Sequence, residues 1–184
     1  MKHTATMALM LTLGVAGVYA QQIPVNMTFS GDGTPSVINL GHPNTFNSEE
    51  NLAGSGTGGP FTFRLVRAST AAPQPSTTCS GPTKVFFQSV AGAGLFRFID
   101  GSLLIVNITG GGDCIDFAAN QAQCTLTFQI TGGTGRFEGA TGVLTLTEAS
   151  TPILSDASNP PNPVFFTETG EFTGTISRGG NSRP

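Results

Sequence analysis

The sequence predicts an all-β fold, an antiparallel closed barrel of about eight strands, with a β-sandwich as the alternative. Short segments alternate between apolar and polar residues, which is the period of a half-buried strand. Glycine- and proline-rich stretches separate these segments, and the chain after residue 20 shows no amphipathic helical segment of about ten residues or more. A barrel is favoured because closure removes the exposed edges that apolar strands would otherwise present to other chains.

The clearest element is a strand pair around the sequence GGTGRFEGATG. On the first strand, residues 125–131, Leu, Phe and Ile alternate with Thr and Gln, and Leu144 and Leu146 continue this pattern on the return strand. The connection has neither the lysine of a phosphate-binding loop nor the third glycine of a dinucleotide-binding turn, because Glu138 occupies that position. It therefore predicts a tight reversal with positive φ angles, in which Phe137 plugs the barrel end. The glycines of this turn are Gly132, Gly133, Gly135, Gly139 and Gly142.

The chain before this pair predicts strands separated by loops. Residues 23–30 alternate, and Pro24 places this strand at an edge or at its beginning. Residues 31–33 are expected to turn the chain, and residues 37–40 to form a short second strand. Residues 41–60 lack an apolar period and are rich in Gly, Asn and Ser, so a loop is expected there.

Further elements follow from residue 61 onward. Asp100-Gly101 is the strongest short hairpin signal, and residues 103–106 are apolar at every position, which predicts burial on both faces. In chain order we expect strands at 61–66, 84–90, 95–99 and 102–109, a loop at 69–83, a glycine break at 110–112, a second proline-rich loop at 150–163, and one or two strands at 164–177.

The first 20 residues are predicted to be a signal peptide. The apolar run Met7–Val18 is too short to span a bilayer, and small residues at the −3 and −1 positions place cleavage between Ala20 and Gln21. The alternative is an uncleaved membrane anchor. Cleavage leaves 164 of the 184 residues, enough for one domain with a core. The chain is thus divided into the signal peptide 1–20, N-terminal strands and a Gly-rich loop at 21–60 within the barrel domain, a barrel core at 61–177 and a disordered tail at 178–184. We expect a secreted or periplasmic protein with no membrane span after cleavage.

The mature composition argues against several partners. With seven basic and eleven acidic residues, its formal charge is −4, whereas a nucleic-acid-binding protein would carry a basic stripe. Tyr19 leaves with the signal peptide and Trp is absent, so the remaining aromatic residues are all Phe. No cofactor is expected.

Three cysteines allow one disulfide and one leftover thiol in an oxidising compartment. Cys114 and Cys124 lie nearest each other in sequence, so this pair is favoured over pairs that use Cys79. The spacing does not suit a zinc site.

Candidate chemical residues are few. Glu148 is in phase with Leu144 and Leu146, so it is the best candidate for an inward carboxylate, whose pKa an apolar interior would raise; the alternative is a strand-end residue facing water. Arg136 and Glu138 flank Phe137 and would either hold a polar ligand group at the barrel mouth or form a solvated ion pair. Asp113 and Asp116 are weak candidates for a calcium site, because two carboxylates fall short of six to eight oxygens. His42 lies in a loop, so a Ser-His-Asp site is not supported.

The stretch ITGGTGRFEGATGVLTLT resembles the recurring turn of the allene oxide cyclase and dirigent-like barrels, and is closer still to bacterial exported proteins of unknown function that carry it. The ending TGEFTGTIS is similar to their closing strand, and the resemblance covers about residues 61–177. It implies an eight-stranded antiparallel barrel with an apolar cavity, often oligomeric. In the plant members this cavity steers the cyclisation or coupling of an apolar or phenolic intermediate without a cofactor.

The sequence therefore supports two functional hypotheses. The first is non-catalytic: a secreted barrel that binds a small apolar ligand or serves as an extracellular interaction or structural module. A cavity lined by phenylalanines would favour ligand binding and a filled interior a structural role; the residues concerned are Phe63, Phe96, Phe98 and Phe128. The second is a cofactor-free cyclase or isomerase, which requires an inward charged group among Glu148, Arg97 and Arg136. The enzyme assignment stays open at this stage, with the non-catalytic function favoured.

Overall fold

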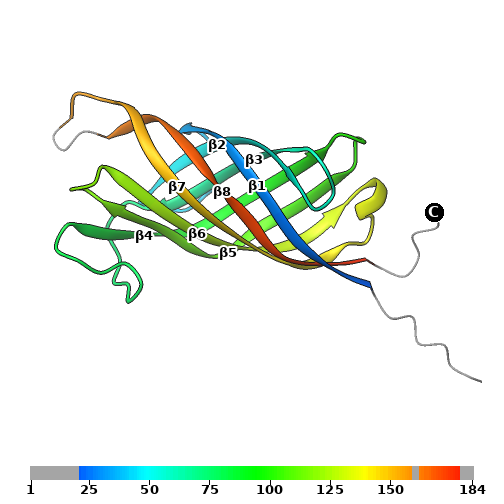
Figure 1. Cartoon of the computed structure of the whole chain (residues 1–184). Helices are drawn as coiled ribbons and strands as arrows, with labels where there is room; N and C mark the ends of the chain where they lie inside the picture. The colour runs from blue at the N-terminus through cyan, green and yellow to red at the C-terminus, as the bar shows by residue number, and fades with distance from the viewer. Residues whose placement is uncertain (1–20, 159–161, 179–184) are drawn as a thin grey trace, which may run out of the picture.

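The computed structural model describes residues 21–158 and 162–178, and over these residues the chain forms eight antiparallel strands that close into a barrel (Figure 1). Each strand pairs with the next along the chain, and β8 pairs with β1, so the two ends of the described chain lie side by side. This confirms the predicted all-β closed barrel. The strands are β1 (Gln21–Pro35), β2 (Thr45–Gly56), β3 (Phe61–Thr70), β4 (Lys84–Phe98), β5 (Leu103–Asp116), β6 (Gln121–Gly133), β7 (Thr141–Ser155) and β8 (Pro163–Arg178).

Alternation along the strands separates a buried interior from a polar exterior. On β6, Leu126, Phe128 and Ile130 are buried, whereas the residues between them are exposed or half-buried. Apolar side chains fill the half of the barrel near the turns β2–β3, β4–β5 and β6–β7. This core includes Met27, Phe29, Phe61, Phe63, Phe96, Phe98, Phe128, Leu144, Leu146 and Phe172.

The N-terminal region differs from the expectation in three respects. β1 continues through Gly31-Asp32-Gly33 to Pro35, and residues 37–40, expected as a strand, form none. Within the expected loop at 41–60, residues 45–56 form β2. The apolar period is missing from β2 because two of its inward positions carry polar residues, Ser48 and Glu50.

The middle strands are longer than expected. The predicted strands at 84–90 and 95–99 merge into β4, and β5 runs through the glycines at 110–112, where a register shift between Ile108 and Gly110 absorbs the irregularity. Burial of residues 103–106 on both faces was a wrong expectation: Leu104 and Val106 are buried, but Ile105 is 41 % exposed.

The turns predicted at residues 100–101 and between β6 and β7 are present. Asp100 and Gly101 connect β4 to β5, with Gly101 at a φ of 80° and an Asp100 Oδ1 that accepts from the Ser102 N–H. Between β6 and β7 the chain forms a short 3₁₀ turn, η1 (Gly135–Phe137), and the Phe137 ring is buried at the barrel end. Positive φ occurs at three of the five glycines of this connection, namely Gly135, Gly139 and Gly142.

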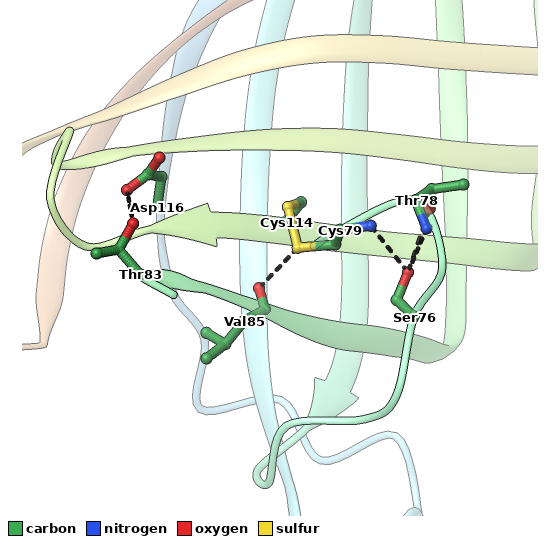
Figure 2. Close-up of a disulfide and its surroundings, with 7 residues drawn as sticks. All are labelled: Ser76, Thr78, Cys79, Thr83, Val85, Cys114 and Asp116. Atoms are coloured by element: carbon green, nitrogen blue, oxygen red, sulfur yellow. Dashed lines mark hydrogen bonds between the residues drawn. A yellow bond between two sulfur atoms is a disulfide. The ribbon is translucent and has the colours of Figure 1, made fainter. Parts of the chain in front are cut away.

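The disulfide joins Cys79 to Cys114, and Cys124 is free and buried (Figure 2). The predicted Cys114–Cys124 pair is therefore wrong. Asp113 lies opposite Cys124 in the β5–β6 register, so Cys114, one residue further, faces the other side of the sheet. The bridge ties the loop between β3 and β4 to β5, and the Cys79 N–H in this loop donates to Ser76 Oγ (Figure 2).

Some predictions concern residues outside the described ranges. The signal peptide at 1–20, including Ala20, and all but the first residue of the tail at 178–184 lie there. In the described part of the chain, no helix has the length and apolar character needed to cross a membrane.

Candidate functional site

Five ionisable side chains from five strands meet inside the barrel, in the half of the interior that the phenylalanine core does not occupy. They lie toward the ends of the strands that carry the loops around 36–44, 71–83, 117–120 and 156–162. Each is buried, with a relative exposure of 7 % or less. This group, called the acidic cluster below, consists of Glu50 on β2, Arg67 on β3, Asp113 on β5, Glu148 on β7 and Glu168 on β8.

Arg67 holds two of the four carboxylates. Its Nε donates to Glu50 Oε1 over 2.6 Å, and its Nη1 donates to Asp113 Oδ2 over 2.7 Å. Burial would lower the pKa of Arg67, but the carboxylates of Asp113 and Glu50 outweigh burial and raise this pKa well above its usual value. The guanidinium is therefore permanently charged and fixes one side of the cluster.

Five further carboxylate oxygens of the cluster have no hydrogen-bond partner within the described residues. They are both oxygens of Glu148, both oxygens of Glu168, and Oε2 of Glu50. One oxygen from each of these three glutamates lies within 4.8 Å of the others. More than nine in ten buried polar groups in proteins are paired, so five unpaired oxygens in one place call for a functional explanation.

Burial changes the protonation of this trio. Burial, with the neighbouring charges of Glu50 and Glu148 acting in the same direction, raises the pKa of Glu168 to about 11. Burial also raises the pKa of Glu148 well above its usual range, with the Glu50 carboxylate adding to the effect. Burial raises the pKa of Glu50 too, although Arg67 opposes the shift. Glu168 is therefore a neutral acid at pH 7, and burial shifts Glu148 toward the same neutral form.

Cys124 lies beside the cluster as a thiol. Its Sγ is 3.7 Å from Arg67 Nη1, and burial raises the pKa of the thiol well above its usual value, with the Asp113 charge adding to the shift. A buried, protonated thiol is a poor nucleophile and a poor metal ligand.

The phenylalanines expected to line a cavity instead pack against one another. The ring centroids of Phe63 and Phe96 are 4.3 Å apart, and those of Phe63 and Phe128 are 6.0 Å apart. Phe172 inserts between them, with its centroid 4.8 Å from that of Phe96. These spacings are those of contacting aromatic rings, so this half of the interior is a filled core.

The structure separates the other sequence candidates. Glu148 points inward, as the alternation predicts, whereas Glu138 and Arg97 are exposed. Arg136 does not pair with Glu138: its Nε lies 3.3 Å from Asp100 Oδ2 and its guanidinium lies over the Phe137 ring. Arg136 thus closes the aromatic end of the barrel, far along the strands from the acidic cluster.

The suggested pair Asp113 and Asp116 does not form a joint site. Asp113 binds Arg67 inside the barrel, but Asp116 accepts hydrogen bonds from Thr83 Oγ1 and from the N–H groups of Ala118 and Ala119. Their spacing of three residues puts them on opposite faces of β5.

The sequence analysis missed Glu50 and Arg67 and did not select Glu168. A signal for Arg67 was present, because it continues the inward series of Phe61, Phe63 and Leu65. Glu168 shares its phase with the buried Phe172. Glu50 had a weaker signal, since only Leu52 marks the inward face of β2 as apolar.

Comparison with known proteins finds similarity at the level of fold. No protein-family model and no curated protein matches the chain. Among solved structures, the pterocarpan synthase dirigent protein GePTS1 is similar over 95 % of this chain and 100 % of that chain, at 12 % identity and a TM-score of 0.42. The site is therefore interpreted from its own geometry.

Proposed function

We propose that this protein is an exported binding barrel that holds a small ligand at the acidic cluster. The observation that carries the proposal is the set of five unpartnered oxygens on Glu50, Glu148 and Glu168. An unsatisfied buried polar group costs about 1–3 kcal/mol. Three such side chains in one layer weaken the apo fold, and a ligand that meets them recovers this free energy.

The protonation of the cluster favours a particular ligand chemistry. A neutral Glu168 carboxyl donates a hydrogen bond, the raised pKa of Glu148 favours the same donor form, and the low local dielectric strengthens such bonds. The apolar residue Leu146 lies two positions from Glu148 on the same face. We therefore propose a small, largely apolar ligand with one oxygen acceptor.

Export is part of the same proposal. The Cys79–Cys114 bridge suits an oxidising compartment, as expected for a secreted or periplasmic protein.

Native mass spectrometry of protein purified from its own host tests the proposal. The expected result is a small-molecule adduct that is weakened in Glu148→Gln and Glu168→Gln. Glu171→Gln is the matched control, because Glu171 lies on β8 but faces outward. The proposal fails if no adduct survives under conditions that keep the barrel intact, or if all three variants retain the adduct equally.

A second candidate function is a cofactor-free cyclase or isomerase. It is favoured by the neutral buried carboxyls, since a carboxylic acid kept protonated by an apolar site can donate a hydrogen bond to an oxygen that gains negative charge. Such a reaction conserves mass. Incubating the isolated guest with the protein would then change its chromatographic retention without changing its mass, and simple binding would return it unaltered.

A further inference from the structure

We propose that Glu50, Glu148 and Glu168 together form a binding site for one divalent metal ion that prefers oxygen ligands, with Ca²⁺ as the best fit. This inference deepens the proposed function and rests on the acidic cluster being a binding site. It adds that one ligand of the acidic cluster is a divalent metal ion. It does not require the organic ligand proposed above.

The distances between the donor atoms fit a shared ion. One oxygen of each glutamate lies within 4.8 Å of the others. Two oxygens that both coordinate Ca²⁺ at about 2.3–2.6 Å are separated by at most about 5 Å. A single ion can therefore contact all three carboxylates without a change in the barrel backbone.

The three glutamates also have carboxylate oxygens that are available to a ligand. Glu148 and Glu168 are each 1 % exposed, and among the described residues none of their four oxygens has a hydrogen-bond partner in good geometry, although the Cys124 thiol lies beside Glu148 across the β6–β7 ladder. Glu50 directs Oε1 to Arg67 and leaves Oε2 unpartnered. Together they provide five free oxygens, close to the six to eight that Ca²⁺ takes from bidentate and monodentate carboxylates.

The barrel places these oxygens on a rigid frame. β1 lies between β2 and β8, and its Gly33 and Gly31 pair with Glu50 and Glu168 respectively. Gly170, two residues after Glu168 on β8, pairs with Glu148 on β7. The three glutamates thus come from strands whose mutual register is fixed by continuous ladders.

The charge balance also fits a divalent ion. Arg67 balances one of the two carboxylates it contacts, Glu50 and Asp113, so full ionisation of all four acids leaves a net charge of −3. A divalent ion reduces this to −1.

The donor set selects a hard cation. All three ligands are carboxylates, whereas Zn²⁺ sites usually include His or Cys. Mg²⁺ demands octahedral geometry and usually keeps several waters, which three ligands of 1 % exposure leave little room to accommodate. Ca²⁺ accepts irregular, carboxylate-rich coordination, and Mn²⁺ is a paramagnetic probe for the same oxygens.

Calorimetric titration of chelator-treated protein with Ca²⁺ alone tests the site. We expect saturable binding of one ion. At a free Ca²⁺ concentration of about one hundred times Kd, the melting temperature should rise by about 5–10 °C. Glu148→Gln and Glu168→Gln should each weaken binding by at least about tenfold, since even outer partners of metal ligands contribute that much.

Two control variants separate this site from surface binding. Glu171→Gln, on the outer face of β8, and Asp156→Asn, in the exposed β7–β8 loop, should both bind Ca²⁺ like the wild type. No saturable binding to the wild type, or equal binding by all four variants, would overturn the proposal.

A second measurement needs no variant. Mn²⁺ should broaden the NMR amide signal of Gly170, which pairs with Glu148, before that of Phe137 at the opposite end of the barrel. Equal broadening of both signals, or broadening confined to Phe137, would contradict the site. Failure here is distinguishable from failure of the proposed function, because these titrations contain no organic ligand and the adduct measurement does not depend on Ca²⁺.

Discussion

The pH dependence of stability follows from the burial of Glu168. Burial raises its pKa from an ordinary value of 4.5 to about 11 in the folded chain. Between these two values the folded state keeps one proton that the unfolded state has lost. The stabilising effect of this proton is complete below pH 4.5 and is lost as pH rises toward 11, by about 1.4 kcal/mol per pH unit.

The magnitude is large in an accessible range. From pH 5 to pH 8, Glu168 alone should lower the free energy of unfolding by about 4 kcal/mol, and this slope requires only that its folded pKa stay above 8. Glu148 contributes a second slope of the same sign. The charged and titratable groups that face Glu168 are Glu50, Glu148, Arg67 and Asp113, and among these Arg67 opposes the shift.

The assay is urea unfolding of chelator-treated protein at pH 5, 6, 7 and 8. Glu168→Gln cannot lose a proton, so the slope of its unfolding free energy against pH should be smaller than that of the wild type. Glu171→Gln should retain the full slope. A wild-type stability that is flat or increases from pH 5 to pH 8 would refute the reasoning, and so would an unchanged slope in Glu168→Gln.

Four further predictions concern stability and covalent structure. Arg67→Met should cost about 3–5 kcal/mol in urea unfolding, because it leaves two buried carboxylates without their cation; a loss under 1 kcal/mol would contradict the ion-pair assignment. Gly94→Ala should cost about 1–3 kcal/mol, because a Cβ there would lie 2.3 Å from a ring carbon of a buried phenylalanine, whereas Gly110→Ala meets no atom within 4 Å; equal effects would argue against the packing. Cys79→Ser should lower the free energy of unfolding by about 4 kcal/mol, the value of the chain-entropy model for a separation of 35 residues. Cys124 should stay unlabelled by thiol reagents until the protein unfolds, because it is buried. Rapid labelling of Cys124 in the native protein would show an open interior.

The barrel could be predicted from the sequence because most inward-facing positions are apolar. The alternation of Leu126, Phe128 and Ile130 identifies a half-buried strand directly, and the Asp100-Gly101 turn identifies a hairpin. The ends of the strands were harder to predict. β1 passes through Gly31 and β5 through its glycine run, because glycine signals a turn but also fits where strands approach closely.

Only part of the acidic cluster could be predicted from the sequence, and the reason is physical. Glu148 follows two apolar residues of its own phase, so one strand is enough to predict that it points inward. Glu50 lies where inward residues are polar, which erases the apolar period that marks a strand. The convergence of Glu50, Glu148 and Glu168 depends on barrel closure through β1, which periodicity within one segment does not specify.

The cysteine pairing shows the same limit. Proximity in sequence favoured Cys114 and Cys124, but their opposite phases across the β5–β6 ladder exclude a bridge. Cys124 shares its phase with Leu126, so its inward position could have been inferred once the register was known.

A high-resolution crystal structure of protein purified from its own host, without chelator, tests the central claim most directly. The account expects electron density for an occupant between Glu50, Glu148 and Glu168, in contact with the oxygens that lack protein partners. The opposite result would be three glutamates that bond to one another or to ordered waters, with no ion or ligand among them. That result would leave the acidic cluster as a structural element of the barrel and would contradict its role as a binding site.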